Sequence, residues 1–307
     1  MNGAKFVDVC VATYRRPGPL TELLESLAKQ NFGANQMRII VVDNDREESA
    51  RGFVETFRAK SAVEVHYEVE PCQNISVARN RALQNVRAEY FAFLDDDETV
   101  SPDWLSTLLA AISKHSADVV FGPVKSILPP SAPAWAKKHP VFHRPRFATG
   151  TQVEHGGCGN VLIRRYVLEH PPQLFDPAYG VSGGEDTDFF YRLFLSGRRL
   201  IWCDEAEAHE RVPNERVSID WVCRRSFRGG HCWMRIFVQH YSFPRKMLWF
   251  TTKGAQLLGG VGLLPIVRVI SPILYMKLLS RVWATAGQLA ALLCNKFLYK
   301  KYDTSSH

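Results

Sequence analysis

The chain has 307 residues, 46% of them hydrophobic and 22% charged, which is the composition of a folded protein and excludes wholesale disorder. Its length allows one large domain, or one domain with an appended region. No signal-peptide pattern precedes the first strand-like run, and the seven scattered cysteines contain no CxxC pair. We therefore expect a reducing, cytosolic setting without a zinc ribbon or a disulfide framework.

The formal net charge of +7 is divided unevenly along the chain. Residues 1–210 hold 23 basic and 28 acidic side chains, whereas residues 211–301 hold 15 basic and two acidic ones, a net charge of +13. Such a basic region is typical of proteins that bind nucleic acid or an anionic membrane surface. The long apolar runs between its charges favour lipid, and we expect no nucleic-acid partner.

Strand-like and helix-like stretches alternate over the first half of the chain. Apolar, β-branched runs predict strands at residues 6–14, 37–44, 63–69, 89–97 and 118–124. Helical periodicity predicts helices at residues 20–30, 49–60, 74–86 and 103–114, the third capped by Asn74 or Ser76. This order predicts an α/β fold with a mostly parallel, Rossmann-like sheet flanked by helices on both faces.

The second half is less regular. A stretch rich in proline and basic residues over 126–150 predicts a long excursion over the sheet, and a glycine-hinged strand follows at 155–165. A loop then leads into an amphipathic helix within 180–199. We expect a first domain over 1–215, with halves at 1–125 and 126–215, and a basic, apolar helical region over 216–307.

Polar residues stand at the carboxyl ends of the first four predicted strands, where ligands of parallel sheets bind. They lie at Thr13–Arg16, Asp43–Asp45, Glu70–Asn74 and Asp95–Glu98. Neither GxGxxG nor GxxxxGK[ST] is present there, so the edge carries neither a dinucleotide fingerprint nor a P-loop.

The run FAFLDDDETV places four acids at the end of the fourth predicted strand. In an extended chain Asp95 and Asp97 face one side while Asp96 points away. Two such carboxylates could bind Mg²⁺ or Mn²⁺, with a diphosphate completing the ligand set and the cation relieving the repulsion between the acids. A solvated turn before a helix N-terminus explains the residues equally well.

A second acidic cluster, in SGGEDTDFF, follows two glycines that would allow the backbone to approach a ligand closely. Glu185, Asp186 or Asp188 could serve as a general base, although each could instead cap the helix. His209 is a third candidate metal ligand from a separate segment. Arg79 or Arg81 could bind a phosphate, and helical periodicity favours Arg79.

The ordered set VATYRRP, VVDND, NISVARN, FLDDDETVSPDWL and GGEDTDFF resembles the motifs of family 2 inverting glycosyltransferases of the GT-A fold, over roughly residues 5–230. NISVARN, LDDDETVSPDWL and SGGEDTDFF are especially similar to bacterial succinoglycan-type β-1,4-glucosyltransferases of exopolysaccharide assembly. The resemblance implies a nucleotide-diphospho-sugar donor, with UDP-glucose or a similar sugar as the expectation. By similarity, Thr13 and Tyr14 would border the base, Asp43 would bind the nucleoside, and Arg79 would lie beside it.

The same resemblance implies roles for the acids. Asp95 and Asp97 match the DXD pair, with Asp97 as the direct metal ligand; Asp186 matches the catalytic base, and His209 matches a metal-associated histidine of some relatives. The QxxRW motif of processive members is absent, and RRSFRGGHCW stands in its region at 224–233, which implies transfer of a single sugar. A sugar nucleotidyltransferase and a non-catalytic membrane-bound scaffold are the alternatives, and the intact acidic motifs argue against the scaffold.

The apolar runs of the basic region are interrupted by charges and prolines, so none provides the roughly 18 to 20 uninterrupted residues of a spanning helix. These interruptions are Lys253, Pro265, Arg268, Pro272, Lys277 and Arg281. We expect amphipathic helices in the membrane interface, or alternatively helices packed on the first domain. Together with the resemblance, this predicts a peripheral or monotopic enzyme on the cytoplasmic face of the inner (plasma) membrane, acting on a lipid-linked saccharide.

Overall fold

A computed structural model describes residues 6–169 and 174–293. The chain forms two compact units. The first unit comprises residues 1–125, 146–180 and 185–210, and the second comprises residues 126–145, 181–184 and 211–307. The end of the predicted basic region, residues 294–307, lies outside the described residues.

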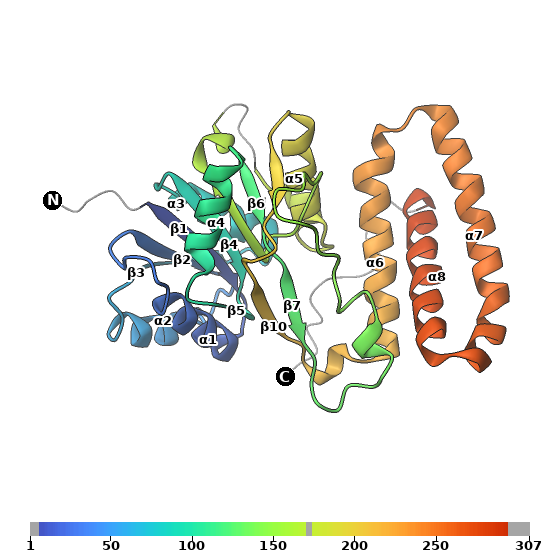
Figure 1. The fold of residues 1–307 in the computed structure, drawn as a ribbon, viewed down its shortest axis with the longest axis horizontal. Coiled ribbons are helices and arrows are strands. Elements are labelled where there is room, and N and C mark those ends of the chain that lie inside the picture. Colours follow the sequence, from blue (N-terminus) through green and yellow to red (C-terminus); the bar gives the residue numbers. More distant parts are fainter. Residues whose placement is uncertain (1–5, 170–173, 294–307) are drawn as a thin grey trace. The chain divides into compact units, whose positions relative to one another are not determined.

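Within the described residues, the first unit is built on a seven-stranded sheet in the order β3-β2-β1-β4-β8-β6-β9 (Figure 1). The strands are β1 (Val7–Thr13), β2 (Met37–Asp43), β3 (Glu64–Val69), β4 (Tyr90–Asp95), β6 (Val119–Phe121), β8 (Asn160–Arg164) and β9 (Leu200–Trp202). The five strands predicted before residue 125 and the glycine-hinged strand are therefore confirmed, although β6 is shorter than its predicted range.

The sheet is mostly parallel, as predicted, with one reversed strand. β1 pairs in parallel with β2 and β4, β2 with β3, and β6 with β9. β8 lies between β4 and β6 and is antiparallel to both. The sequence predicts this strand but neither its direction nor its place in the sheet.

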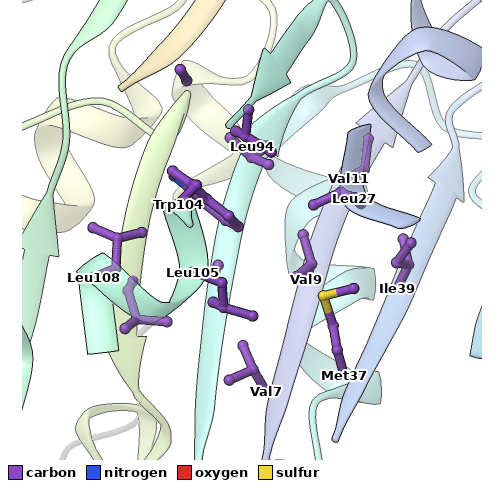
Figure 2. Packing of buried hydrophobic residues seen from close by; sticks show 14 of the residues in the cluster. Val7, Val9, Val11, Leu27, Met37, Ile39, Leu94, Trp104, Leu105 and Leu108 are labelled. Carbon is purple, nitrogen blue, oxygen red and sulfur yellow. The ribbon is translucent and has the colours of Figure 1, made fainter. Parts of the chain in front are cut away.

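Helices cover both faces of the sheet. They are α1 (Pro17–Ala28), α2 (Arg51–Arg58), α3 (Ile75–Asn85), α4 (Trp104–Lys114) and α5 (Glu185–Leu195). Buried residues of α1, α2 and α4 share one core with alternate residues of β1 and β2. Those of α3 and α5 share another core with Cys10 of β1 and with Ile40 and Val42 of β2. Figure 2 shows the first core, where Val7, Val9 and Val11 of β1 lie among side chains such as Leu27 and Trp104. The alternation along β1 supplies both cores.

A small second sheet continues directly from the end of β4. It contains β5 (Glu98–Val100), β10 (Ala208–Arg211) and β7 (Val124–Ile127), in the order β5-β10-β7. β5 pairs antiparallel with β10, so that Thr99 lies opposite His209. The acidic run therefore turns from one sheet into the other.

The second unit consists mainly of α6 (Ile219–Phe237), α7 (Phe243–Ile270) and α8 (Pro272–Leu293), with α8 packed on both α6 and α7. Two glycines allow α6 and α8 to approach closely. A Cβ added at Gly230 would lie 1.9 Å from the carbonyl oxygen of Ala284, and one at Gly287 would lie 2.0 Å from that of Phe227. Gly230 of RRSFRGGHCW thus has a packing role together with Gly287, because larger residues at these positions would separate the helices.

Segment 126–145, predicted within the first domain, contributes to the core of the second unit. Its Ala136 and Phe142 pack with residues of α6 and α8, including Val222 and Met276. The Nε2 atom of His139 lies 3.2 Å from the carbonyl oxygen of Met276. Burial of these apolar side chains therefore holds segment 126–145 against α6 and α8.

The expected break at Pro265 is wrong, because this proline lies inside α7, which runs for 28 residues. The chain does break before Pro272, which opens α8. Among the described residues, α7 is the one helix whose length and composition would allow it to cross a membrane. Its most apolar stretch of 18 residues has a mean hydropathy of 1.3, and 6% of that stretch is buried. Many of its large apolar side chains are exposed, including Phe243, Leu258 and Val269.

Candidate active site

The sheet register brings the polar strand ends of the first unit together. Thr13, the last residue of β1, pairs with Asp43 of β2, and Ala12 pairs with Asp95 of β4. Asp43 in turn pairs with Val69 at the end of β3. Since all these strands are parallel, their carboxyl ends form one edge, which is where the sequence predicts ligand binding.

β4 ends at Asp95, and the chain turns at Asp96 and Asp97 before β5 begins at Glu98. We call Asp95–Glu98 the acidic turn. The side chains of Asp95 and Asp97 are partly exposed, whereas that of Asp96 is buried, so exposure alternates along the turn. Asp96 does not point toward solvent on the far side, because its Oδ2 accepts a hydrogen bond of 2.8 Å from Thr13 Oγ1. Burial raises the pKa of Asp96 to about 6.

Two arginines neutralise the acidic turn from different segments. Arg16, the N-cap residue of α1, donates through Nη1 to Asp97 Oδ2 at 2.9 Å and to Asp96 Oδ1 at 3.2 Å. Arg79 donates through Nη2 to Asp95 Oδ1 at 3.1 Å. The repulsion that the sequence analysis assigns to a bound cation is thus offset in this structure by two guanidinium groups.

Arg79 comes from α3, whose N-cap is Asn74, the first of the two candidates. The Asn74 side chain accepts hydrogen bonds from the backbone N–H groups of Ser76 and Val77. Arg79 lies buried and also donates through Nη1 to Glu185 Oε1 at 2.7 Å. Arg81, the other candidate for this edge, instead pairs with Glu70. Arg79 therefore links the acidic turn to the start of α5.

A glycine-rich segment, Gly156–Gly159, runs into β8 and touches both acidic clusters. A Cβ added at Gly159 would lie 2.4 Å from Glu98 Oε1 and 3.3 Å from Asp95 Oδ2. One added at Gly157 would lie 3.3 Å from Asp186 Oδ2. Glycine at these positions lets the backbone pass close to the carboxylates. The segment therefore brings Asp186 and the acidic turn into one neighbourhood, which the sequence alone does not predict.

The three acids of α5 have different surroundings. Glu185 is buried against Arg79, and Asp188 accepts a 2.8 Å hydrogen bond from Arg192 Nε one turn later in the helix. Asp186 accepts a hydrogen bond from the Thr187 backbone N–H and presents Oδ2 toward Gly157. The preceding Gly183 and Gly184 have φ angles of 85° and 96°, a region that favours glycine. Asp186 is thus the acid of this cluster beside the glycine-rich segment.

The expected nucleoside residues lie at the ends of β1 and β2. Asp43 is fully buried and accepts hydrogen bonds from the backbone N–H groups of Ala50 and Asp45 and from the Tyr67 hydroxyl. Burial raises the pKa of its carboxyl group. Asp43 therefore shapes the loop between β2 and α2 from inside.

The Arg15 guanidinium lies over the Tyr14 ring, 5.2 Å from its centroid. Its Nε donates to Asp45 Oδ2 at 2.9 Å, which fastens the loop after β1 to the loop after β2. Arg15, Arg16 and Asp45 lie within the polar strand ends that the sequence predicts at this edge, but the sequence assigns none of them a role of its own. Their signal was their place directly after predicted strands, but charged loop residues are usually solvated.

His209 lies in β10, and its Nε2 atom is 3.7 Å from Glu207 Oε2. Across residues 6–169 and 174–293, no group of three or more His, Cys, Asp or Glu side chains is placed to hold a metal ion. The structure therefore does not assemble the predicted trio of Asp95, Asp97 and His209. The two carboxylates still suit Mg²⁺ or Mn²⁺, because Mg²⁺ sites commonly use one or two carboxylates with substrate phosphates and water.

The family model described as Glycosyl transferase family 2 matches residues 8–170, more than half of the chain. The chain belongs to this family. It is 41% identical over 241 residues to the succinoglycan biosynthesis protein ExoM of Rhizobium meliloti (strain 1021), which covers 78% of this chain and 77% of the relative. It is 24% identical over 243 residues to the glucosyl-dolichyl phosphate glucuronosyltransferase of Haloferax volcanii, covering 73% and 74% of the two chains.

Solved structures show the same fold. The mannosyltransferase PcManGT from Pyrobaculum calidifontis, in complex with GDP-Man and Mn²⁺, matches with a TM-score of 0.67 at 16% identity, covering 95% of this chain and 88% of that one. The S. aureus TarS 1–349 complex with UDP-GlcNAc matches with a TM-score of 0.55 at 17% identity, covering 96% and 93%. The predicted GT-A fold is therefore confirmed for this member of glycosyl transferase family 2.

Proposed function

We propose that this family 2 member is an inverting glycosyltransferase that moves one sugar from UDP-glucose, or a similar UDP-sugar, to a lipid-linked saccharide in bacterial polysaccharide biosynthesis. The 41% identity to a succinoglycan biosynthesis protein supports the pathway class. The observation that carries the chemistry is the Gly157–Gly159 segment, which approaches both Asp186 and Asp95. A proton acceptor and a donor-binding acid thus flank one backbone segment.

In this proposal, Asp186 accepts the proton of an acceptor hydroxyl while that oxygen attacks the anomeric carbon. The bond from this carbon to the diphosphate breaks on the opposite face, and its electron pair leaves with the nucleoside diphosphate. A single displacement inverts the carbon, so an α-linked donor gives a β-glycoside. No covalent enzyme intermediate is required.

Asp97 and Asp95 would hold Mg²⁺ or Mn²⁺, which would neutralise the charge of the leaving diphosphate. Arg79 keeps Asp95 in place and joins it to Glu185. Thr13 and Tyr14 border the nucleoside in this proposal, and Asp43 acts by fixing the loop beside it. His209, which lies opposite Thr99 just after the acidic turn, remains the proposed third metal ligand.

The direct test is a screen of UDP-, GDP- and dTDP-sugars with lipid-linked saccharide acceptors, read out by nucleoside diphosphate release and by the anomeric configuration of the product. We expect a β-linked product from an α-linked UDP-sugar, and loss of turnover after exhaustive chelation. Formation of pyrophosphate would instead indicate a nucleotidyltransferase. Full turnover in the chelated sample would contradict the proposed metal role.

We further propose that the second unit binds the cytoplasmic surface of the inner membrane as a peripheral or monotopic element. Val269 of α7 is 88% exposed, and Leu258 is 77% exposed. Arg245, Lys246 and Lys253 of the same helix could face anionic headgroups. Exposed apolar side chains together with basic ones suit an interfacial helix, and a lipid-linked acceptor would lie in the same membrane.

Val269→Asp should release the protein from anionic liposomes, because a charge on an apolar interfacial face must be desolvated. Leu195→Asp is the matched control, since Leu195 is 52% exposed but belongs to the first unit. Flotation of both variants with liposomes measures the effect. Equal retention of the two variants on liposomes would contradict the assignment of α7 to the membrane surface.

A further inference from the structure

Arg16 binds the acidic turn at the carboxylate to which we assign the metal. Its Nη1 donates to Asp97 Oδ2 at 2.9 Å and to Asp96 Oδ1 at 3.2 Å. The Arg16 side chain is 43% exposed, whereas that of Asp96 is 7% exposed. One guanidinium group therefore bridges a buried acid and a more accessible acid.

The buried acid provides a fixed point for this arginine. Thr13 Oγ1 donates to Asp96 Oδ2 at 2.8 Å and Arg16 donates to Oδ1, so both oxygens of Asp96 are engaged. Pro17 directly follows Arg16 and opens α1, which restrains the backbone at this point. The Arg16 side chain is thus anchored at its backbone and at Asp96, while 43% of its surface remains exposed to solvent.

A guanidinium group and a divalent cation repel each other at one carboxylate, and the guanidinium has no acceptor atom to offer the metal. Arg16 and an arriving metal therefore compete for Asp97. A nucleoside diphosphate would compensate for that loss, since arginine binds phosphate oxygens well.

We infer that Arg16 is an internal counter-ion that competes with the metal for Asp97, an inference that rests on the proposed function. When metal and donor bind together, Arg16 turns to the donor diphosphate. Arg16 then disfavours metal binding in the absence of nucleotide and favours it in its presence. The two ligands are coupled: each raises the affinity for the other, with Arg16 carrying part of the coupling.

A purely structural role for Arg16, fastening the start of α1 to the acidic turn, makes a different prediction. Removing such a fastener would loosen the turn and leave metal affinity equal or lower. Arg15 offers a matched comparison, because it is the neighbouring arginine but pairs with Asp45 instead of the acidic turn. Arg16→Lys keeps the charge and provides a second comparison.

The experiment measures Mn²⁺ binding to the full-length chain by electron paramagnetic resonance, with and without UDP. Arg16→Gln should bind Mn²⁺ alone at least about tenfold more tightly, because a neighbouring charge commonly changes the affinity of a carboxylate for a cation by this order or more. Its affinity for UDP with saturating Mn²⁺ should fall. Arg15→Gln and Arg16→Lys should resemble the unchanged protein in their affinity for Mn²⁺ alone.

An Arg16→Gln variant whose affinity for Mn²⁺ alone equals or falls below that of the unchanged protein would overturn the inference. If the unchanged protein still bound Mn²⁺ in the presence of UDP, the proposed metal role would survive that result. If no variant bound Mn²⁺ with UDP, both the metal role and the inference would be wrong. Glycosyl transfer need not be measured for either conclusion.

Discussion

Two arginines from different segments bind the acidic turn, and their side chains differ in burial. The side chain of Arg79 is 5% exposed and that of Arg16 is 43% exposed. Arg79 is enclosed with Glu185, whereas Arg16 reaches Asp97 from an open helix start. Similar ion pairs therefore serve different purposes: the buried one fixes the geometry of the site, and the exposed one can exchange partners.

Arg79→Gln should produce the largest loss of stability among the substitutions around the acidic turn. It leaves the buried Glu185 carboxylate without its guanidinium partner, and breaking a buried ion pair typically costs about 3–5 kcal/mol. Arg81→Gln is the control, because Arg81 pairs with Glu70 nearer the surface and should cost at most about 1 kcal/mol. Urea unfolding measures both. A difference below about 1 kcal/mol between the free energies of unfolding of the two variants would contradict a special role for the buried ion pair.

Alanine substitution at two glycines tests how tightly the surroundings of each arginine are packed. Gly159→Ala would place a methyl group 2.4 Å from Glu98 Oε1, so we expect a loss of about 1–3 kcal/mol in the free energy of unfolding. Gly18→Ala, near Arg16, meets no atom within 4 Å and should be neutral or stabilising by about 0.5–1 kcal/mol. Thermal and urea unfolding measure both variants. Equal losses of stability would show that the surroundings of Gly159 and Gly18 are packed equally tightly.

Asp97→Asn should change stability little, by at most about 1 kcal/mol, because its pair with Arg16 is partly exposed. The same substitution should remove most of the metal-dependent binding of the donor, since an amide is a weaker ligand for a hard cation. Calorimetric titration with UDP and Mn²⁺ measures the second effect. Donor binding that stays metal-dependent and undiminished would move the metal away from Asp97.

Much of this fold follows from local pattern, because the buried strands carry apolar runs and α1 and α4 carry one apolar face. The antiparallel place of β8 depends on pairing between distant segments, which periodicity does not encode. Pro265 was expected to interrupt a helix, but α7 continues through it with the loss of a backbone hydrogen bond that flanking turns can absorb. The packing of residues 126–145 with α6 and α8 likewise depends on contacts between distant apolar residues.

The positions of several candidate site residues on the fold follow from local pattern for the same reason. Asp95, Asp97 and Asp186 stand at the ends of elements whose positions the sequence predicts. Helical periodicity also places Arg79 toward the acidic turn. Arg16 was missed because an arginine in a loop is usually solvated, and its partners lie about eighty residues further along the chain. His209 stays a prediction, since the described residues show no group of three or more potential ligands that would include it.

The central claim is that Asp186 is the base of the glycosyl transfer. Asp186→Asn keeps a side chain that can accept the Thr187 N–H but cannot take the proton, so the measurement is transfer rate alongside affinity for donor and metal. Asp188→Asn is the control, because Asp188 is held by Arg192. We predict that Asp186→Asn binds donor normally and transfers sugar at least about a hundredfold more slowly, while Asp188→Asn transfers at a near-normal rate. Near-normal transfer by Asp186→Asn would contradict the account.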